Sequence, residues 1–255
     1  MATTKKKTAK RTAKTQAPTA KKSVSQVMAE LKKCGNEKTR KIFQRHGARN
    51  LFGVSVADMK VIAKSIKCQQ ELARQLYATG HDDAMYLAGI VADGALMSKK
   101  ELDQWAKQAG WYMVAEYTVP WVAIENPHGR DMAIKWIGSK KESIASTGWA
   151  TYAGLASYYP DEQLDLPEIQ GLLETVKNEI HQQPNRVRYT LNGFVIAVGG
   201  CVKPLLKQAK QVAAKIGKVE VEMGDTSCRV PLATEYIAKM GKAGRIGKKR
   251  ANIKC

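Results

Sequence analysis

The sequence has few cysteines and no long hydrophobic run, and these two deficits narrow its class. The five cysteines among 255 residues are scattered and odd in number, which favours reduced thiols in an intracellular protein over a disulfide framework. Apolar runs such as Phe194–Val198 are far shorter than the roughly 20 residues of a membrane-spanning helix. No apolar stretch follows the basic first residues, so we expect neither a membrane span nor a secretory signal.

Common cofactor and catalytic motifs are also missing. The sequence contains no GxGxxG, P-loop, HExxH or CxxC pattern, and its four histidines are isolated. We therefore expect no metal site and no small-molecule cofactor. Cys228, in GDTSCRVP, is a single cysteine after a turn, and such a residue more often belongs to loop structure than to a catalytic nucleophile.

Acidic residues are missing from both ends of the chain. Residues 1–22 contain eight Lys or Arg and no acid, and residues 239–255 contain seven and no acid. Residues 23–238 hold the other 27 basic residues against all 23 acids, a net charge of only +4. We expect residues 1–22 to be a disordered tail because they lack large apolar side chains. Phosphate neutralisation is the main use of such a tail; a solubilising tail and a transit peptide are the alternatives.

Between the ends, the pattern predicts about twelve helices joined by short loops. Apolar residues recur at helical spacing, and Gly or Pro marks many of the ends. We expect a bend or break at Pro120, an end at Gly199–Gly200, and a short extended piece at Val219–Val221. The predicted helices cover residues 23–33, 36–47, 55–66, 71–79, 82–96, 98–109, 111–122, 130–137, 144–158, 167–181, 185–198, 204–216 and 231–240.

Helices of this length predict an all-α fold, a HEAT-like α-solenoid over residues 23–238 followed by a basic C-terminal segment, 239–255. About six antiparallel helix pairs would occupy this range, near the period of roughly 40 residues of such repeats. An irregular helical bundle is the alternative. A solenoid would offer a long concave face suited to an extended ligand.

Aromatic residues gather in one part of the chain, and all five tryptophans lie between Trp105 and Trp149. We expect Trp105, Trp121 and Trp136 to belong to the core. Aromatic faces can also stack on bases in a nucleic-acid cleft. The candidates for that role are Trp111, Tyr112, Trp149 and Tyr152.

Two segments in this region, LDQWAKQAGWYMVAEYTVPW and GRDMAIKWIGSKKESIASTGW, resemble the AlkD-type DNA alkylation repair proteins, a family of HEAT-like repeat DNA glycosylases. Trp105 and Trp111 match the family's first tryptophan-rich segment, and Trp136, Ile137 and Ser139 match the second. The segments PNRVRYTLNGFVIAVGG and GDTSCRVP…GRIGKKRANIKC resemble one bacterial subgroup. The resemblance implies a solenoid that holds duplex DNA on its concave basic face and, in active members, cuts the glycosidic bond of cationic alkylated purines without flipping the base.

The sequence departs from the family at the residues that the resemblance makes catalytic, an Asp and a partnering Arg. The Asp positions hold Tyr112 and Ala115, and the nearest acid is Glu116. One residue turns a side chain by about 100° on a helix, so Glu116 can serve only if the helix is rotated or bent. No Lys or Arg occurs from Ser143 to Val176. The sequence therefore indicates a DNA-binding relative with weak or no glycosylase activity; an active glycosylase using Glu116 and a non-enzymatic protein scaffold are the alternatives.

Several basic residues are candidates for phosphate contacts. Arg186 and Arg188 occur at the start of a predicted helix, where free backbone N–H groups favour an anion; pairing with an acid such as Glu179 is the alternative. We expect both on the surface. The remaining candidates are Lys140, Lys141, Lys248, Lys249 and Arg250. The expected partner is double-stranded DNA, and we expect a monomer in the bacterial cytoplasm, associated with the nucleoid.

Overall fold

The computed structural model describes residues 21–254, and within them every regular element is helical. Short 3₁₀ turns separate several helices, and one π-helical turn, η2, covers Val114–Thr118. The α-helices are α1 Val24–Cys34, α2 Glu37–Arg45, α3 Val56–Ser65, α4 Gln70–Ala78, α5 Asp82–Val91, α6 Lys99–Gln108, α7 Val119–Glu125, α8 Gly129–Ile137, α9 Glu142–Tyr158, α10 Leu166–Glu179, α11 Asn185–Cys201, α12 Leu206–Ile216 and α13 Ala233–Lys242.

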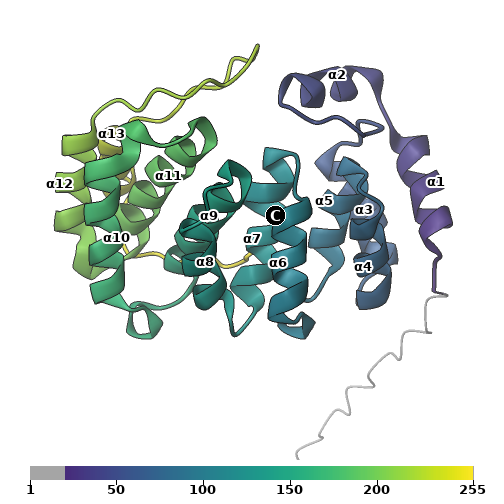
Figure 1. The fold of residues 1–255 in the computed structure, drawn as a ribbon, viewed down its shortest axis with the longest axis horizontal. Coiled ribbons are helices and arrows are strands. Elements are labelled where there is room, and N and C mark those ends of the chain that lie inside the picture. The colour runs from purple at the N-terminus through teal and green to yellow at the C-terminus, as the bar shows by residue number, and fades with distance from the viewer. Residues whose placement is uncertain (1–20, 255) are drawn as a thin grey trace, which may run out of the picture.

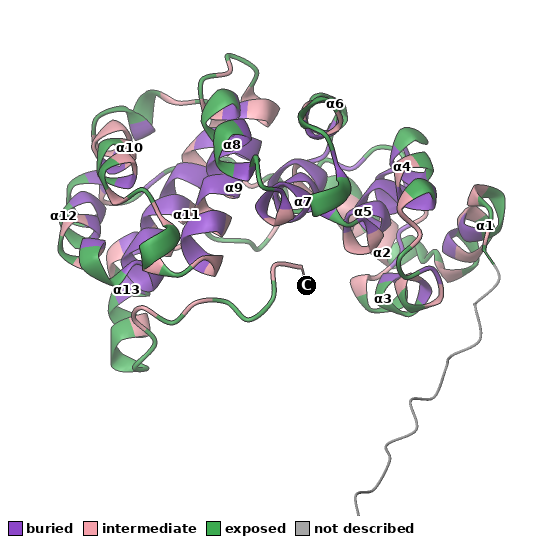
Figure 2. Cartoon of the chain, turned by 90° about the horizontal axis from the view of Figure 1, so that it is seen from below, coloured by how far each residue is buried: buried purple, intermediate pink, exposed green. Residues whose placement is uncertain are grey.

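The helices stack side by side into a curved array, which confirms the predicted all-α solenoid (Figure 1). Figure 2 shows the array as an arch: α4, α6, α8 and α10 lie on its outer side, and α3, α7 and α11 on its inner side. We call the inner side the concave face. Neighbouring helices pack along their length, most extensively α9 against both α8 and α11.

Side-chain caps fix several helix starts where the sequence predicts them. The side chains of Ser23, Asn36 and Ser55 each accept a hydrogen bond from the backbone N–H three residues later. Ser98 and Glu101 form a capping box, with the Glu101 carboxylate accepting from the Ser98 N–H at 2.7 Å. Each cap contributes about 1 kcal/mol, because it satisfies backbone donors that the helix leaves free.

The predicted end of the helix that begins at Asp82 was wrong. The helix from Asp82 ends at Val91 rather than at Leu96, because Asp93 turns its side chain back to the Ala95 N–H and starts a 3₁₀ turn. The irregularity near Pro120 is the π-turn before it. Pro120 has no N–H to donate to the carbonyl four residues earlier, which favours the wider turn. Residues 219–221, predicted as a short extended piece, belong to no helix.

The glycine pair at 199–200 lies inside α11, which continues to Cys201 instead of stopping there. A Cβ on Gly199 would lie 2.5 Å from the Ile237 side chain, and one on Gly200 would lie 2.4 Å from Met240. The two glycines therefore allow α13 to approach α11 closely, and they mark a packing contact rather than a helix end.

The C-terminal segment, residues 243–254, runs back along the concave face, as its path in Figure 2 shows. Sequence reasoning treated it as separate from the helical domain. Its backbone instead bonds to α11 and α9: the Gly247 N–H donates to the Gly200 carbonyl, and the Arg250 N–H donates to the Ser157 carbonyl, both at 2.8 Å. Ile253 packs against the hydrophobic cores of both halves of the arch.

The predicted N-terminal tail lies outside the described residues, except for Lys21 and Lys22. Lys22 bonds to Glu30 at 2.6 Å and to Ser65 at 2.9 Å. Among residues 21–254, no single helix has the length and apolar composition of a membrane span; only α11 with the following Lys203–Ile216, joined at a bend of 109°, would pass as a pair.

Candidate functional site

Glu116, the sequence candidate for a charge-stabilising carboxylate, lies on the π-turn η2. A π-turn changes the direction of the side chains that follow it, and this supplies the rotation that the sequence required of Glu116. The carboxylate is almost fully buried, with 3% of the side chain exposed. It reaches the wall of a small cavity of about 190 Å³ between η2, α9 and α11, which Tyr117, Tyr189 and Arg250 also line.

The carboxylate of Glu116 is held by Arg186 from the first turn of α11. Arg186 donates from Nε to Oε1 at 2.9 Å and from Nη2 to Oε2 at 2.5 Å. Residues 143–176 contain no arginine to partner this acid, and the structure provides one from farther along the chain. The expectation of a surface Arg186 was also wrong, because only 17% of its side chain is exposed.

Two tyrosines complete the surroundings of Arg186. Its guanidinium carbon lies 4.2 Å from the ring centre of Tyr112 and 4.4 Å from that of Tyr189. A cation between two aromatic faces is stabilised by their quadrupoles. Burial raises the pKa of Tyr112 to about 12, against the opposing effect of Arg186. Burial likewise raises the pKa of Glu116 above its ordinary value, and hydrogen bonds from Arg186 oppose that shift.

His46, at the end of α2, connects this cluster to the N-terminal half. The Trp111 indole N–H donates to the His46 carbonyl at 2.9 Å, and the Tyr112 hydroxyl lies 2.8 Å from His46 Nδ1. Burial, assisted by the charges of Arg45 and Arg186, lowers the pKa of His46. The ring is therefore neutral at pH 7, and its Nδ1 can accept a hydrogen bond from the Tyr112 hydroxyl.

The other aromatic candidates lie in the core and not in an open cleft. Trp111, Trp149 and Tyr152 are 3%, 3% and 2% exposed. Trp149 and Tyr152 pack edge-on against Phe194, and the Tyr152 hydroxyl bonds to Glu168. The expectation that these rings face a nucleic-acid cleft was wrong, because helical spacing directs them between the packed helices. Tyr112 is the member of the set that remains half-buried at the site.

Some of the basic candidates already have a hydrogen-bond or ion-pair partner, and others are exposed without one among the described residues. Lys249 is 19% exposed and forms an ion pair with Asp161 at 2.7 Å. Arg188 is half-buried and bonds to Asn185 at 3.4 Å. Lys141 donates to the Lys107 carbonyl at 3.1 Å. Lys140, Lys248 and Arg250 are exposed, with no side-chain bond to another described residue.

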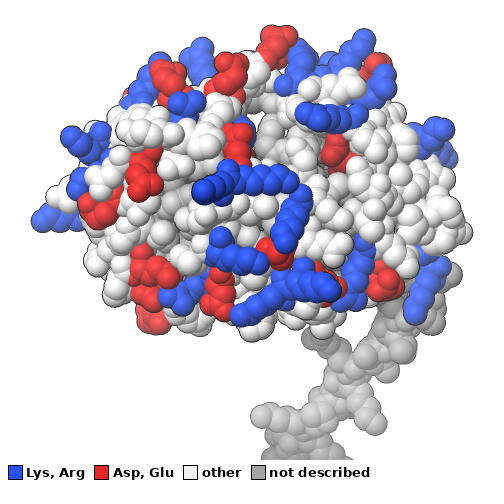
Figure 3. All heavy atoms as spheres, in the orientation of Figure 1, with Lys and Arg blue, Asp and Glu red and all other residues white. Residues whose placement is uncertain are grey.

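Acidic side chains accompany the basic ones on the convex face, which Figure 3 displays. Lys99 pairs with Asp131 at 3.0 Å, and Lys135 pairs with Asp103 at 3.0 Å. Arg130 reaches Glu168 at 2.8 Å. This pairing neutralises much of the convex charge.

Two residues of the site, Tyr189 and His46, were not predicted from the sequence. Tyr189 follows Arg186 by one helical turn, and this i, i+3 spacing could have indicated their contact. His46 is distant in sequence and gave no such signal. No group of three or more His, Cys, Asp or Glu that could hold a metal ion occurs among residues 21–254.

Comparison with known proteins places these features in a family. A family model described as DNA alkylation repair enzyme matches residues 27–215. Uncharacterized protein Lin0241 of Listeria innocua serovar 6a is 30% identical over 221 residues, which cover 84% of this chain and 95% of the relative. Uncharacterized protein Lmo0209 of Listeria monocytogenes serovar 1/2a is 29% identical with the same coverage.

A solved structure extends the comparison to three dimensions. It represents a new family of proteins related to the HEAT-like repeat DNA glycosylases with affinity for branched DNA structures. It is 39% identical to this chain, with a TM-score of 0.85, and the match covers 92% of this chain and 100% of that one.

Proposed function

The chain belongs to the DNA alkylation repair enzyme family, and from that premise we propose that it is a DNA-binding protein that holds branched or distorted duplex DNA on its concave face. The observation that carries the proposal is the solved relative with affinity for branched DNA structures, which the match covers over 100% of its length and over 92% of this chain. The sequence predicted binding to duplex DNA, damaged or distorted. The proposal here is more specific: the preferred DNA already changes direction before the protein binds it.

Charge on the concave side supports this assignment. Arg250, from the C-terminal segment, lines the small cavity beside Glu116, and Lys248 is exposed nearby in the sequence. The carboxylates closest to this segment are already neutralised, Asp161 by Lys249 and Glu125 by Lys254. The segment therefore neutralises two carboxylates that would otherwise repel phosphates.

Binding measurements test the proposal directly. The full chain is titrated into a labelled four-way junction and into a linear duplex of equal length, at several salt concentrations. We expect tighter binding to the junction, and a linear fall of log affinity with log salt for both. Equal affinity for the two DNAs would refute the preference, and a slope near zero would refute the phosphate contacts.

A second function, excision of cationic alkylated purines, is favoured by the Glu116–Arg186 pair. This pair supplies an acid and an arginine, the two residue types that the family resemblance implies for catalysis, from different positions of the chain. Both carboxylate oxygens of Glu116 are bonded to Arg186, however, and 3% of the side chain is exposed. Sharing its charge with Arg186 weakens its attraction for a sugar cation, so we expect weak or undetectable release of 3-methyladenine and 7-methylguanine from alkylated duplex.

An excision assay with Glu116→Gln separates the two functions. Loss of one preorganised charged group commonly lowers a rate by about 10²–10³. Robust release by the wild type, with a loss of this size in Glu116→Gln, would establish the enzyme and refute our expectation. Robust release that Glu116→Gln leaves intact would refute it too, and would exclude Glu116 from the chemistry.

A further inference from the structure

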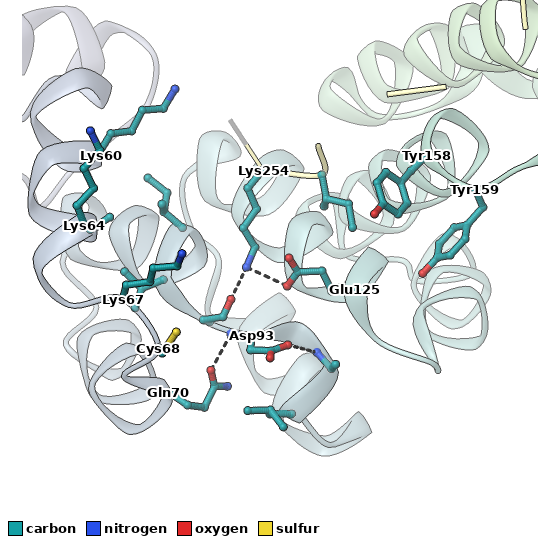
Figure 4. A pocket seen from close by; sticks show the side chains of 17 residues that line it. Lys60, Lys64, Lys67, Cys68, Gln70, Asp93, Glu125, Tyr158, Tyr159 and Lys254 are labelled. Carbon is teal, nitrogen blue, oxygen red and sulfur yellow. Dashed lines mark hydrogen bonds and ion pairs between the residues drawn. The ribbon is translucent and has the colours of Figure 1, made fainter. Parts of the chain in front are cut away.

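A second cavity is separate from the Glu116 site. Its volume is about 910 Å³, and it lies between α3 and the far wall formed by Tyr158, Tyr159 and the C-terminal segment. Figure 4 shows Lys60, Lys64 and Lys67 along one side and the two tyrosines on the other, with Lys254 between them.

Three lysines occupy one side of the cavity: Lys60 and Lys64 come from α3, and Lys67 from the turn that follows it. Met59 and Ile62 of α3 are buried in the core, whereas the three lysines line the cavity and are exposed. None of them forms an ion pair or side-chain hydrogen bond with another residue of 21–254, in contrast to the paired lysines of the convex face. Lys60 and Lys64 are like charges at i, i+4 of one helix, and their repulsion destabilises it. An anion in the cavity would offset this repulsion.

The two carboxylates that line the cavity already have partners. Glu125 pairs with Lys254 at 2.9 Å, and Asp93 accepts from the Ala95 N–H at 3.0 Å. The charged lining therefore consists of four lysines and two carboxylates, a net charge of +2. This charge selects an anionic ligand.

Size and spacing narrow the ligand further. The three lysines lie along one wall of the cavity (Figure 4), so that successive phosphates of one strand can each meet a positive charge. Pockets of about 300–1,000 Å³ take ligands of drug size. The cavity of about 910 Å³ therefore admits a few nucleotides of one strand and not a duplex. Tyr158 offers a half-buried ring across from the lysines, and unpaired bases stack on such rings.

We infer that this cavity binds a short single-stranded DNA segment leaving a branch point, with its phosphates on Lys60, Lys64 and Lys67 and a base against Tyr158. The inference rests on the proposed function, because it assigns one arm of the branched ligand to a specific part of the concave face. Its ligand is unpaired DNA, which distinguishes it from the duplex arms.

Three labelled probes test the inference by fluorescence anisotropy: a linear duplex, the same duplex with a short oligo(dT) flap, and a four-way junction without unpaired bases. The variant K60Q/K64Q/K67Q removes three charges. The matched control K207Q/K210Q/K215Q removes three exposed, unpaired lysines from α12, away from the cavity. Thermal unfolding of both variants verifies that they fold.

We expect wild type to bind the flap probe more tightly than the duplex, and the α3 variant to lose that advantage. For the flap probe, its slope of log affinity against log salt should flatten by about 2, since each single-strand phosphate contact contributes about 0.7. Duplex and junction binding should be unchanged, and the α12 variant should keep the flap advantage. An equal loss on all three probes, or a wild type that gains nothing from the flap, would overturn the inference. Failure of the proposed function would appear separately, as a junction bound no more tightly than the duplex.

Discussion

Removing Arg186 should destabilise the protein far more than a surface substitution would. The side chains of Glu116 and Arg186 are 3% and 17% exposed and share two charge-assisted hydrogen bonds. Arg186→Ala leaves the Glu116 carboxylate buried without its partner, and breaking such a pair from one side costs about 3–5 kcal/mol. In a domain of this size we expect the melting temperature to fall by about 10 °C.

Two further variants separate the ion pair from simple loss of packing. Arg188→Ala changes the same first turn of α11, but Arg188 bonds only to Asn185 at 3.4 Å, so we expect a loss below about 1 kcal/mol. Glu116→Leu combined with Arg186→Met removes both charges and keeps much of the volume. The double variant should recover most of the stability lost in Arg186→Ala, because no buried charge remains.

The penalty of Arg186→Ala should depend on pH. Burial already raises the pKa of Glu116 in the folded protein, and losing Arg186 raises it further. A raised folded-state pKa adds stability below the unfolded value of about 4.3, and this stability is lost as pH rises through the folded value. Urea titrations at pH 7 and pH 4 should therefore show a larger difference from wild type at pH 7. A loss below about 1 kcal/mol at both pH values would refute the buried pair.

Three other outcomes follow from particular contacts. Deleting residues 243–255 should lower the urea midpoint of unfolding by the equivalent of about 2 kcal/mol or more. The reason is that Asp161 and Glu125 lose their partners and the apolar contacts of Ile253 are removed. An unchanged midpoint would mean that the segment is not docked. Asp103→Asn should cost about 1–2 kcal/mol at pH 7 and much less near pH 2. Burial opposes ionisation, but bonds from Lys107, Lys135 and Trp136 lower the pKa of Asp103 to about 2. Its stabilisation is therefore present above the unfolded value and is lost as pH falls through the folded one. Deleting residues 1–22, with eight basic residues and no acid, should weaken DNA binding and flatten its salt slope; the same slope in the truncated protein would exclude the tail as a DNA contact.

Local chemistry made the fold predictable from the sequence. Caps such as Ser98 with Glu101, and apolar stripes such as Met59 and Ile62, act within one or two helical turns. The prediction of helix ends failed where the same residue type can either end a helix or allow close packing inside it. Gly199 and Gly200 look like a helix stop, yet they serve the approach of α13, a contact with residues almost 40 positions away.

The site was less predictable because its contacts cross the array. Glu116 and Arg186 are 70 residues apart, and Trp111 and His46 are 65 apart. The spacing of Lys60, Lys64 and Lys67 was visible in the sequence, but a row of lysines is usually a solvated helix face. Only the three-dimensional path of the C-terminal segment shows that these lysines face a cavity.

These long-range contacts bear on which DNA would suit the concave face in the function that we propose. In an open solenoid each repeat contacts only its neighbours, and the curvature can relax. Here Lys254 bonds to Glu125 and to the Ala92 carbonyl, 162 residues away, and the loop around Met223 and Gly224 lines a cavity together with Arg45 and His46 of the other half. The C-terminal segment and this loop thus bring together parts of the array that are distant in sequence, which restrains its curvature. A linear duplex bent to follow such a surface costs about 1–6 kcal/mol of elastic energy. A branched DNA already changes direction at its branch point and avoids most of that cost, so a fixed curvature favours branched over linear DNA without contact to any base.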